Sequence, residues 1–394
     1  MTVRSAGEGC GTGPATVLYV ARAPFFSGAE RALLLLAERL DRSRFRPVVA
    51  VGTEGELAER LRAGGIETVH VPIAYSGVRT AIGWARSVAG FARVLRRTGA
   101  VLVHGNDLQS FQPAGYAARL LGVPSACHLR FPDTKRGYEW FLRPQPDRTF
   151  FISQSFQQSA LKEAPKLFGG RSEVIYDGVQ VMPEPDTRER LELRGRLGLP
   201  RDAFCVVLSG QVAEVKGIWE FLDAAAMLDA QEMNVHFSVI GDDLRTAGRL
   251  RQEAESRVRR NRLEARVTFV GFVRDAHTLL PAFDLVAVPS HVEPLGLSAL
   301  EGMAAARPVV GSDVGGIAET VVHEHTGLLV RPKDASALAA AIGGLAADPA
   351  RAARMGARGR ERVLEHFGID THVARIQQAY DQILTTSSNM GTSQ

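Results

Sequence analysis

The stretch Phe283-Asp-Leu-Val-Ala-Val-Pro-Ser290-His-Val-Glu-Pro-Leu-Gly-Leu-Ser-Ala-Leu-Glu301 decides the fold. Its first eight residues form the kind of apolar run that is typical of a strand buried on both faces of a parallel sheet. From Leu297 the chain has the Ala, Leu and Met content of a helix, and Pro294 and Gly296 turn the chain between the two. A buried strand, a tight turn and a helix form one repeat of an α/β fold, so the sequence predicts parallel sheets covered by helices.

The same stretch carries two carboxylates, Glu293 before the expected helix and Glu301 inside it. The first amides of a helix have no intrahelical partner and lie at the positive end of the helix dipole, so they can bind a pyrophosphate. Glu301 lies five residues into the helix, about 7.5 Å along its axis, which is roughly a ribose away from that phosphate. Glu293 lies on the other side, where a sugar would bind. The alternative is that one glutamate simply lies in a loop and the other on a helix surface, since two acids at this spacing are common in a chain with 43 Asp and Glu.

Short apolar runs alternate with helical segments along the 394 residues. This alternation predicts two doubly wound α/β domains, each with a parallel sheet. Strands of the first sheet are expected at 16–20, 47–51, 68–71, 100–103, 125–129, 148–152 and 173–175. Strands of the second are expected at 204–208, 235–240, 266–270, 285–288, 308–310 and 327–330. The principal helices are expected at 29–40, 78–97, 109–121, 154–163, 187–197 and 297–306.

Two prolines and several charges at 182–186 interrupt this pattern and mark the expected domain boundary. The resulting division is a disordered leader at 1–14, an amino-terminal domain at 15–182 and a carboxyl-terminal domain at 187–366. A last helix at 367–386 is expected to pack back toward the first domain, and 387–394 are expected to be a disordered tail. Ligands of such sheets bind beyond the carboxyl ends of the strands, which predicts a site in the cleft between the domains.

Composition excludes several classes of protein. A net charge of +4 permits contact with phosphates or an anionic membrane, but the chain has no basic block typical of nucleic-acid binding. Its three cysteines are far apart and form no CxxC pair, which argues against a zinc site or a disulfide framework and favours a reducing cytoplasm. We find no apolar run of membrane-spanning length and no signal-peptide core. The expected location is cytoplasmic, with peripheral contact at the inner membrane face left open.

Several segments resemble family 4 retaining glycosyltransferases, which have the GT-B fold: two Rossmann-like domains facing across a cleft. Residues 204–335 resemble their donor-binding half, and the amino half resembles them more loosely. The segments in the second half are Leu208-Ser-Gly-Gln-Val-Ala-Glu-Val-Lys-Gly217, Phe269-Val-Gly-Phe-Val-Arg-Asp275, the Glu-x7-Glu motif, Asp313-Val-Gly-Gly-Ile-Ala-Glu319 and Thr326-Gly-Leu-Leu-Val330. Those in the first half are Phe26-Ser-Gly-Ala-Glu-Arg31, His104-Gly-Asn106 and His128-Leu-Arg130.

The resemblance implies roles for individual residues. Lys216 would hold the distal phosphate of the donor, Glu293 the sugar hydroxyls and Glu301 the ribose, while the backbone at 272–274 would meet the base. His128 would face the transferred sugar, so that the expected catalytic residues are His128, Lys216 and Glu293. The expected donor-binding residues are Gly28, Gln211, Lys216, Phe272, Val273, Arg274, Glu293, Leu295, Gly296, Leu297 and Glu301. The expected acceptor contacts are His104, Asn106 and Arg130.

Gln211 departs from the family pattern, which has an arginine about five residues before the lysine. A glutamine donates a neutral hydrogen bond, and charge-assisted hydrogen bonds are about twice as strong. Stabilisation of the leaving group would therefore depend more on Lys216 and on the helix amides at 295–297.

The predicted activity is retaining transfer of a sugar from a nucleoside-diphosphate sugar, most often a uridine diphosphate sugar, to a hydroxyl group. No Asp-x-Asp metal motif follows a first-domain strand, so no metal or other cofactor is expected and Lys216 would supply the positive charge. The alternatives are a nucleotide-sugar 2-epimerase and a nonenzymatic nucleotide-sugar-binding protein of the same fold. The acceptor stays open between a glycan, a lipid-linked molecule and a small natural product. Four arginines on the helix at 78–97 fit either membrane contact or a solvated edge.

Overall fold

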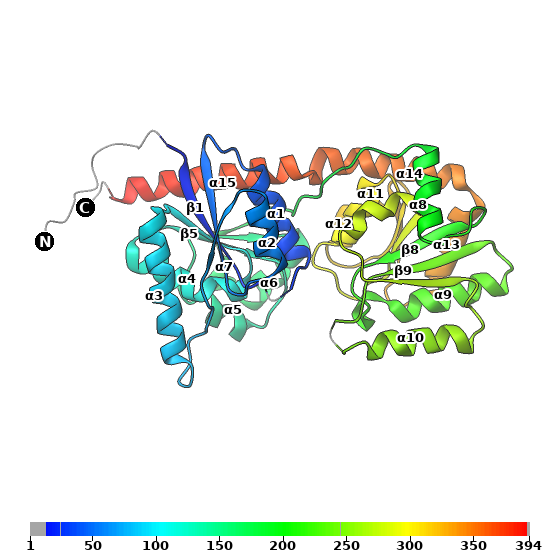
Figure 1. The fold of residues 1–394 in the computed structure, drawn as a ribbon, viewed down its shortest axis with the longest axis horizontal. Helices are drawn as coiled ribbons and strands as arrows, with labels where there is room; N and C mark the ends of the chain where they lie inside the picture. Colours follow the sequence, from blue (N-terminus) through cyan, green and yellow to red (C-terminus); the bar gives the residue numbers. More distant parts are fainter. Residues whose placement is uncertain (1–12, 24, 245, 392–394) are drawn as a thin grey trace, which may run out of the picture. The chain divides into compact units, whose positions relative to one another are not determined.

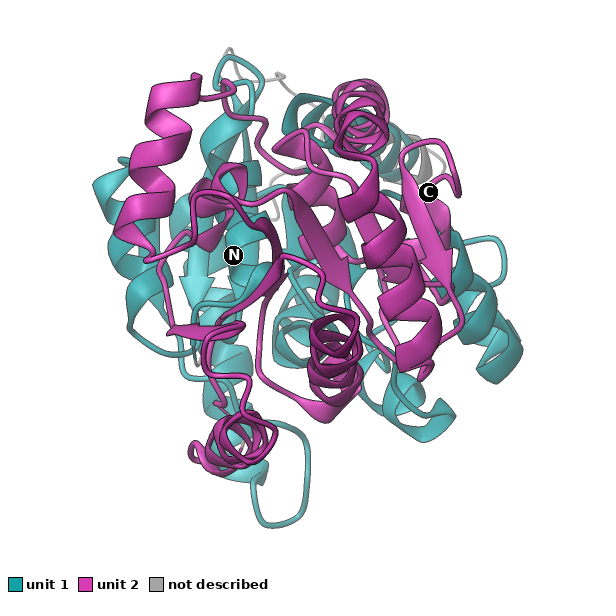
Figure 2. Ribbon diagram, turned by 90° about the vertical axis from the view of Figure 1, so that its right-hand side faces the viewer, with its two compact units in different colours: residues 1–178, 369–394 teal, residues 179–368 magenta. Residues whose placement is uncertain are grey.

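The computed structural model describes residues 13–23, 25–244 and 246–391. The chain forms two compact units (Figure 2): unit 1 combines Met1–Gly178 with Ile369–Gln394, and unit 2 is Val179–Gly368. Most of the expected leader at 1–14 lies outside the described residues, as do the last three residues of the expected tail. Unit 1 is therefore built from two segments of the chain, whereas unit 2 is continuous.

Unit 1 contains a seven-stranded parallel sheet with the order β3-β2-β1-β4-β5-β6-β7 (Figure 1). The direction in which successive strands are added reverses between β1 and β4. The strands are β1 (Ala15–Ala21), β2 (Phe45–Val51), β3 (Glu67–His70), β4 (Leu102–Gly105), β5 (Ser125–Leu129), β6 (Arg148–Phe151) and β7 (Ser172–Val174). The helices are α1 (Gly28–Arg39), α2 (Glu56–Ala63), α3 (Ala81–Thr98), α4 (Leu108–Leu121), α5 (Lys135–Phe141), α6 (Gln154–Glu163), α7 (Pro165–Phe168) and α15 (Ile369–Gly391).

Unit 2 contains a six-stranded parallel sheet with the order β10-β9-β8-β11-β12-β13, and here the reversal falls between β8 and β11. The strands are β8 (Phe204–Ser209), β9 (Val235–Ile240), β10 (Val267–Gly271), β11 (Leu285–Val288), β12 (Val309–Ser312) and β13 (Gly327–Val330). The α-helices are α8 (Thr187–Arg196), α9 (Ile218–Ala230), α10 (Arg249–Arg260), α11 (Leu297–Ala304), α12 (Ile317–Thr320), α13 (Ala335–Ala347) and α14 (Pro349–Arg362). Two short 3₁₀ segments, η1 (Glu214–Lys216) and η2 (Ala276–Ala282), and a π segment, η3 (Val363–Phe367), complete the unit.

Burial on both faces explains why the sequence forms these strands. Residues 17–21 of β1 have no exposed surface, although successive side chains of a strand point to opposite faces of the sheet. Helices therefore cover both faces, as parallel sheets require. The prediction of two doubly wound parallel sheets is confirmed.

The last helix, α15, differs from its expected bounds of 367–386. It begins at Ile369 because Gly368 is extended, with φ −66° and ψ 150°, and pairs with Val179. It continues to Gly391, into the segment expected to be a disordered tail. The hydroxyls of Thr385, Thr386 and Ser387 each donate to the carbonyl four residues earlier, so these polar side chains are bonded within the helix and do not end it.

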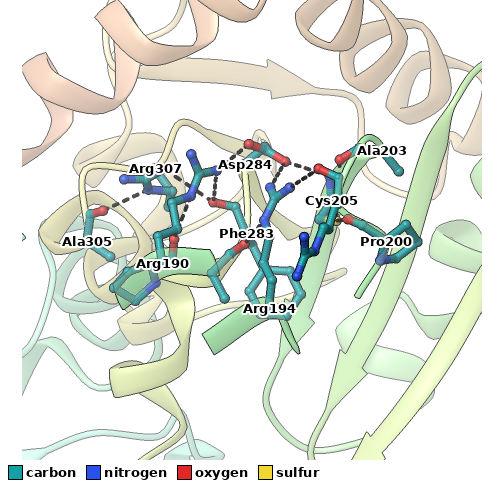
Figure 3. A network of polar contacts seen from close by, with 12 residues as sticks. Arg190, Arg194, Pro200, Ala203, Cys205, Phe283, Asp284, Ala305 and Arg307 are labelled. Carbon is teal, nitrogen blue, oxygen red and sulfur yellow. Dashed lines mark hydrogen bonds and ion pairs between the residues drawn. The ribbon is translucent and has the colours of Figure 1, made fainter. Parts of the chain in front are cut away.

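Helix α8 is fixed to the sheet of unit 2 by a charged network (Figure 3). Arg190 and Arg194 of α8 both pair with Asp284, which directly precedes β11. The Asp284 carboxylate also accepts a hydrogen bond from the amide of Cys205 at 2.7 Å, so it joins α8 to β8 as well. Arg307 donates to the carbonyl of Phe283 beside it. This network fixes α8, which directly follows the 182–186 segment.

No helix within the described ranges is long and apolar enough to cross a membrane.

Candidate functional site

The turn between β11 and α11 contains the Glu-x7-Glu motif. Gly296 caps α11 with φ +89°, a left-handed conformation that favours glycine. Its carbonyl accepts hydrogen bonds from the amides of Ala299 and Leu300 at 2.9 and 3.1 Å. The expected helix therefore starts at Leu297 and presents its amino end at the carboxyl end of β11.

A pair of glycines holds the backbone of this turn. Gly316 donates its amide to the carbonyl of Glu293 at 2.9 Å. A Cβ atom on Gly315 would lie 2.2 Å from the Glu293 carbonyl oxygen, and one on Gly316 would lie 2.3 Å from the Cα atom of Leu295. Only glycine leaves room for this contact, so the Gly-Gly of the Asp313–Glu319 segment fixes the position of Glu293.

Lys216 reaches the same place from β8. It ends η1 and precedes Gly217, where φ is +75° and a Cβ atom would lie 2.1 Å from the carbonyl oxygen of Pro289. The amide of His291 donates to the carbonyl of Val215 at 2.8 Å, which joins this loop to the turn after β11. Both loops are thereby held in contact.

The Lys216 ammonium and the Glu293 carboxylate form an ion pair, with Nζ 2.5 Å from Oε2. The hydroxyl of Ser290 also donates to Oε2, at 3.2 Å. The Lys216 side chain is 33% exposed and that of Glu293 11%, so the pair lies at the edge of the unit with the ammonium more accessible. Ser298 ties the start of α11 to the end of β8 by donating to the carbonyl of Ser209 at 2.8 Å.

Lys216 and Glu293 follow the two strands between which the strand order of unit 2 reverses. Ligands of doubly wound sheets bind outside the carboxyl ends of the strands at such a topological switch point. The structure therefore brings together Lys216, Glu293 and the residues Leu295, Gly296 and Leu297 where this rule places a ligand.

The other expected donor residues of unit 2 lie around this centre. Gln211 follows β8 and is half-buried, and its side chain makes no hydrogen bond to any residue that the structure describes. The segment Phe272, Val273 and Arg274 follows β10, and Phe272 is 60% exposed. Glu301 is half-buried on α11 and lines a cavity of about 140 Å³ with residues of η2 and of the 180–185 segment.

The expected residues of unit 1 form a separate, buried cluster. His128 has no exposed surface, and His104, Asn106 and Arg130 are between 1% and 4% exposed. Arg130 forms a two-pronged pair with Asp177, with Nε and a terminal nitrogen 2.8 and 2.7 Å from the two carboxylate oxygens. It also donates to the Asn106 side chain at 2.8 Å. A contact of these residues with an acceptor or a transferred sugar stays a prediction.

The imidazole rings of this cluster form a column against α15. The ring centroids of His104 and His128 are 5.8 Å apart, and those of His128 and His372 are 6.0 Å apart. His104 Nδ1 lies 2.5 Å from the hydroxyl of Tyr380, which donates to the hydroxyl of Tyr19 at 2.9 Å. Burial, followed by the Arg130 guanidinium, holds the pKa values of His104 and His128 well below the ordinary range, and burial lowers that of His372.

Gly28 stands apart from that cluster, at the exposed start of α1. The side chain of Ser27 before it accepts a hydrogen bond from the amide of Ala29, and the Glu30 side chain accepts from the amide of Ser27 at 3.0 Å. This capping box fixes the turn after β1.

Sequence reasoning missed several residues that shape these two centres. Ser290 and Ser298 lie inside the quoted stretch but were given no role, although a hydroxyl beside a turn acid is a common hydrogen-bond donor. The Gly-Gly of the 313–319 segment was a usable signal for close backbone contact. Asp177, His372 and Tyr380 carry no such signal, because their partners are distant in sequence.

Comparison with known proteins identifies the class to which this fold and site belong. Residues 189–362 match the family described as Glycosyl transferases group 1, and residues 27–168 match the Glycosyl transferase 4-like domain. Alpha-maltose-1-phosphate synthase of Mycolicibacterium smegmatis is 34% identical over 301 residues, which cover 68% of this chain and 75% of that protein. The 2-deoxystreptamine glucosyltransferase of Streptomyces kanamyceticus is 29% identical over 293 residues, with coverages of 72% and 70%.

Solved structures agree on the fold. HepE of Anabaena, in complex with UDP and glucose, superposes with a TM-score of 0.83 at 22% identity, covering 93% of this chain and all of HepE. Sucrose-phosphate synthase of Thermosynechococcus elongatus superposes with a TM-score of 0.74 at 25% identity, covering 95% of this chain and all of that one. The chain belongs to the group 1 glycosyltransferases of family 4. It is a glycosyltransferase with the GT-B fold, an enzyme of a family that transfers sugars from nucleotide sugars.

Proposed function

We propose that this enzyme binds a nucleoside-diphosphate sugar, in the first place a uridine diphosphate sugar, at the switch point of unit 2 and transfers the sugar with retention of configuration. The observation that carries the proposal is the Lys216–Glu293 ion pair beside the amino end of α11. This arrangement offers a diphosphate a cation and helix amides, and it offers a sugar a carboxylate.

Lys216 is the phosphate-binding group in this proposal. An ammonium has three N–H bonds, and the bond to Glu293 leaves two for phosphate oxygens. The amides at the start of α11 add the positive end of the helix dipole. Together they stabilise the charge that develops on the departing diphosphate, so the proposed reaction needs no metal ion.

The remaining groups hold the other parts of the donor. Glu293 accepts hydrogen bonds from the sugar hydroxyls, Glu301 binds the ribose, and the backbone of 272–274 meets the base. Gln211 donates a neutral hydrogen bond to phosphate. HepE has been solved in complex with UDP and glucose and, separately, with UDP-glucose, and the similarity to it supports a uridine donor.

Retention follows from attack on the face from which the diphosphate leaves. The acceptor oxygen bonds to the anomeric carbon as the bond from that carbon to the diphosphate oxygen breaks. The proton of the acceptor hydroxyl passes to the departing diphosphate. Positioning and electrostatic stabilisation then account for the catalysis, and no side chain is needed as a nucleophile.

The proposed acceptor is a hydroxyl of a glycan, of a lipid-linked molecule or of a small natural product, reached in the cytoplasm. The relative that glucosylates 2-deoxystreptamine supports a small-molecule acceptor. Peripheral contact with an anionic membrane is supported by α3, where Ile82 is 71% exposed and Arg86 and Arg93 are also exposed.

Calorimetric titration with UDP, GDP and ADP, followed by transfer assays with the matching nucleotide sugars, tests the proposal. We expect UDP to bind and Lys216→Ala to weaken that binding at least about tenfold, because a charge-assisted hydrogen bond is lost. Lys216→Ala and Glu293→Gln should each abolish acceptor-dependent release of UDP, and excess chelator should leave the wild-type rate unchanged.

Lys162→Ala serves as the matched control, since Lys162 is an exposed lysine on α6, in the other unit. The proposal fails if no nucleoside diphosphate binds, if either site variant keeps near-normal transfer, or if chelator stops the reaction.

A further inference from the structure

The sheet of unit 1 has its own switch point, between β1 and β4. Ligands of doubly wound sheets bind outside the carboxyl ends of the strands at the switch point, so side chains that follow β1 and β4 are candidates for ligand binding. Of the predicted acceptor residues, His104 lies within β4 and Asn106 directly follows it, but both are buried and bonded within the protein. Arg22, which directly follows β1, and Gln109, in the first turn of α4 after β4, are accessible instead.

The hydrogen-bond partners of Arg22 are neutral side chains. Its guanidinium donates to the side-chain oxygen of Gln109, which is neutral. Tyr75 is the second neighbour: burial raises the pKa of its hydroxyl, the Arg22 guanidinium opposes that rise, and the Asp107 carboxylate adds to it. Among the described residues Arg22 pairs with no carboxylate. A half-buried guanidinium that makes no ion pair is available to an anionic ligand, with which its hydrogen bonds would be charge-assisted.

An exposed aromatic ring is held on the other side of Tyr75. Trp140 of α5 is 37% exposed, and its indole nitrogen donates to the hydroxyl of Ser76 at 3.0 Å. The ring of Tyr75, the neighbour of Arg22, lies 6.2 Å from that of Trp140. The side chain of Gln112, which is fully buried, accepts from the amide of Ser76 and donates to the carbonyl of Trp140, both at 2.9 Å.

These contacts hold the indole in place before any ligand binds. Gln112 lies on α4, which packs against α5 (Figure 1). The tryptophan is therefore held both by its backbone carbonyl and by its ring nitrogen. Because the indole N–H is already bonded, its exposed surface is apolar. A pre-positioned aromatic surface loses little conformational freedom on binding, and it suits the C–H face of a sugar or cyclitol ring.

We propose that Arg22 and Trp140 form the acceptor subsite of this glycosyltransferase, and that its acceptor is a hydroxylated ring carrying a phosphate or a carboxylate group. This inference rests on the proposed function, since it supplies the second substrate of that reaction. Arg22 binds the anionic group by a charge-assisted fork, and Trp140 stacks against the ring. Both residues act in binding, and neither takes part in bond making.

The test uses full-length protein saturated with UDP and titrated with matched sugars that differ in one anionic group. The probes are glucose against glucose 6-phosphate, galactose against galacturonate, and myo-inositol against myo-inositol 1-phosphate. In the wild type we expect at least one anionic ring to bind about tenfold more tightly than its neutral partner, the range expected for one charge-assisted pair. Comparison of the phosphate and carboxylate pairs identifies the preferred anion.

Two variants and a control connect the preference to these residues. Arg22→Gln should reduce the preference to less than about twofold and leave UDP binding unchanged. Trp140→Ala should weaken the charged and neutral rings equally, and Trp140→Phe should restore most of the loss. Arg119→Gln, which removes an exposed arginine at the far end of α4 in the same unit, should change nothing. The proposal is overturned if no probe pair shows a preference for its anionic member, either because neither member binds or because both bind equally. It is also overturned if Arg22→Gln keeps the wild-type preference. Failure of UDP itself to bind would instead refute the donor site.

Discussion

At the scale of single residues, the turn that carries Glu293 has room only for glycine at position 316. Gly316 has an ordinary helical backbone, so only space requires glycine there: a Cβ atom would lie 2.3 Å from Leu295 Cα and 2.5 Å from the Pro294 carbonyl oxygen. We expect Gly316→Ala to displace the turn that carries Glu293, to lower transfer at least about tenfold and to lower the free energy of unfolding by about 1–3 kcal/mol. Steady-state kinetics and urea unfolding measure the two effects.

Gly344→Ala provides the comparison for that variant. Gly344 lies within α13, and a Cβ atom there would meet nothing within 4 Å. Because alanine favours a helix interior over glycine by about 1 kcal/mol, this variant should be at least as stable as the wild type, with unchanged kinetics. Equal effects of the two substitutions would show that space around Gly316 is not limiting.

Gln211 stands where the family resemblance leads us to expect an arginine. If its side chain faces phosphate, Gln211→Arg replaces a neutral hydrogen bond by a charged one, and UDP binding should tighten with kcat unchanged or higher. Calorimetry and transfer kinetics on the purified variant test this. A marked fall in kcat would mean that the site is organised around the neutral amide.

The sequence identified Lys216 and Glu293 separately, each by its own motif. Their ion pair could not be predicted, because it joins residues 77 positions apart and depends on how the loops after β8 and β11 meet. The same limit applied to His128, which the family resemblance placed against the transferred sugar. Its burial depends on α15, which brings His372 against it from the far end of the chain.

At the scale of elements, the imidazole column makes the docking of α15 sensitive to pH. The pKa values of His104, His128 and His372 are lowered in the folded protein, so the unfolded chain binds more protons below its ordinary pKa of about 6.5. Stability should therefore fall as pH falls through about 6.5, with Arg130 adding to the effect and the Asp177 carboxylate opposing it. Urea midpoints at pH 8, 6.5 and 5.5 measure this slope.

His372→Gln should flatten that slope, because it removes one group that the unfolded chain protonates. His325→Gln, which changes an exposed histidine in unit 2, should leave it unchanged. A pH-independent midpoint for the wild type, or the same slope in both variants, would contradict the assignment of acid sensitivity to this column.

Helix α8 gives a second prediction at this scale. Arg194 is 6% exposed and shares Asp284 with Arg190, so Asp284→Asn would leave two arginines without their carboxylate (Figure 3). We expect a loss of about 3 kcal/mol in the free energy of unfolding of unit 2, as for other buried pairs from which one partner is removed. Glu192→Gln, which breaks the exposed pair with Arg188, should cost less than about 1 kcal/mol. Similar losses in urea unfolding would mean that Asp284 does not anchor α8.

The elements that the sequence predicted best are the buried strands. Runs such as Leu285–Val288 are apolar throughout because both faces of the sheet are covered, and β5, β9, β11 and β13 have the expected bounds. Helix ends were less predictable. The last helix was expected to end at 386, but it continues to Gly391, and the hydroxyls of Thr385 and Ser387 donate to carbonyls inside it. Helix propensity does not predict whether a Ser or Thr hydroxyl will bond inside a helix or end it.

At the scale of the whole molecule, the two units differ in how the chain builds them: unit 1 needs the last helix, α15, as a second segment, whereas unit 2 is one continuous segment. Five large apolar residues of α15 are at most 5% exposed and belong to the same core as β1: Ile369, Val373, Ile376, Tyr380 and Ile383. Burying one such side chain contributes about 1.5–3 kcal/mol, so their loss approaches the whole stability of a typical domain. Truncation after Gly368 should therefore unfold unit 1 but not unit 2, whose chain is continuous.

Hydrogen exchange and UDP calorimetry on the truncated chain separate the two units. We expect rapid exchange throughout β1–β7, retained protection in β8–β13, and UDP binding within about twofold of the full chain, while transfer is lost because the acceptor subsite at Arg22 lies in unit 1. Tryptophan fluorescence gives an independent readout, since Trp84 and Trp140 lie in unit 1 and Trp219 in unit 2. Protected amides in β1–β7 would show that unit 1 folds without α15, whereas loss of UDP binding would show that the donor site depends on unit 1 as well.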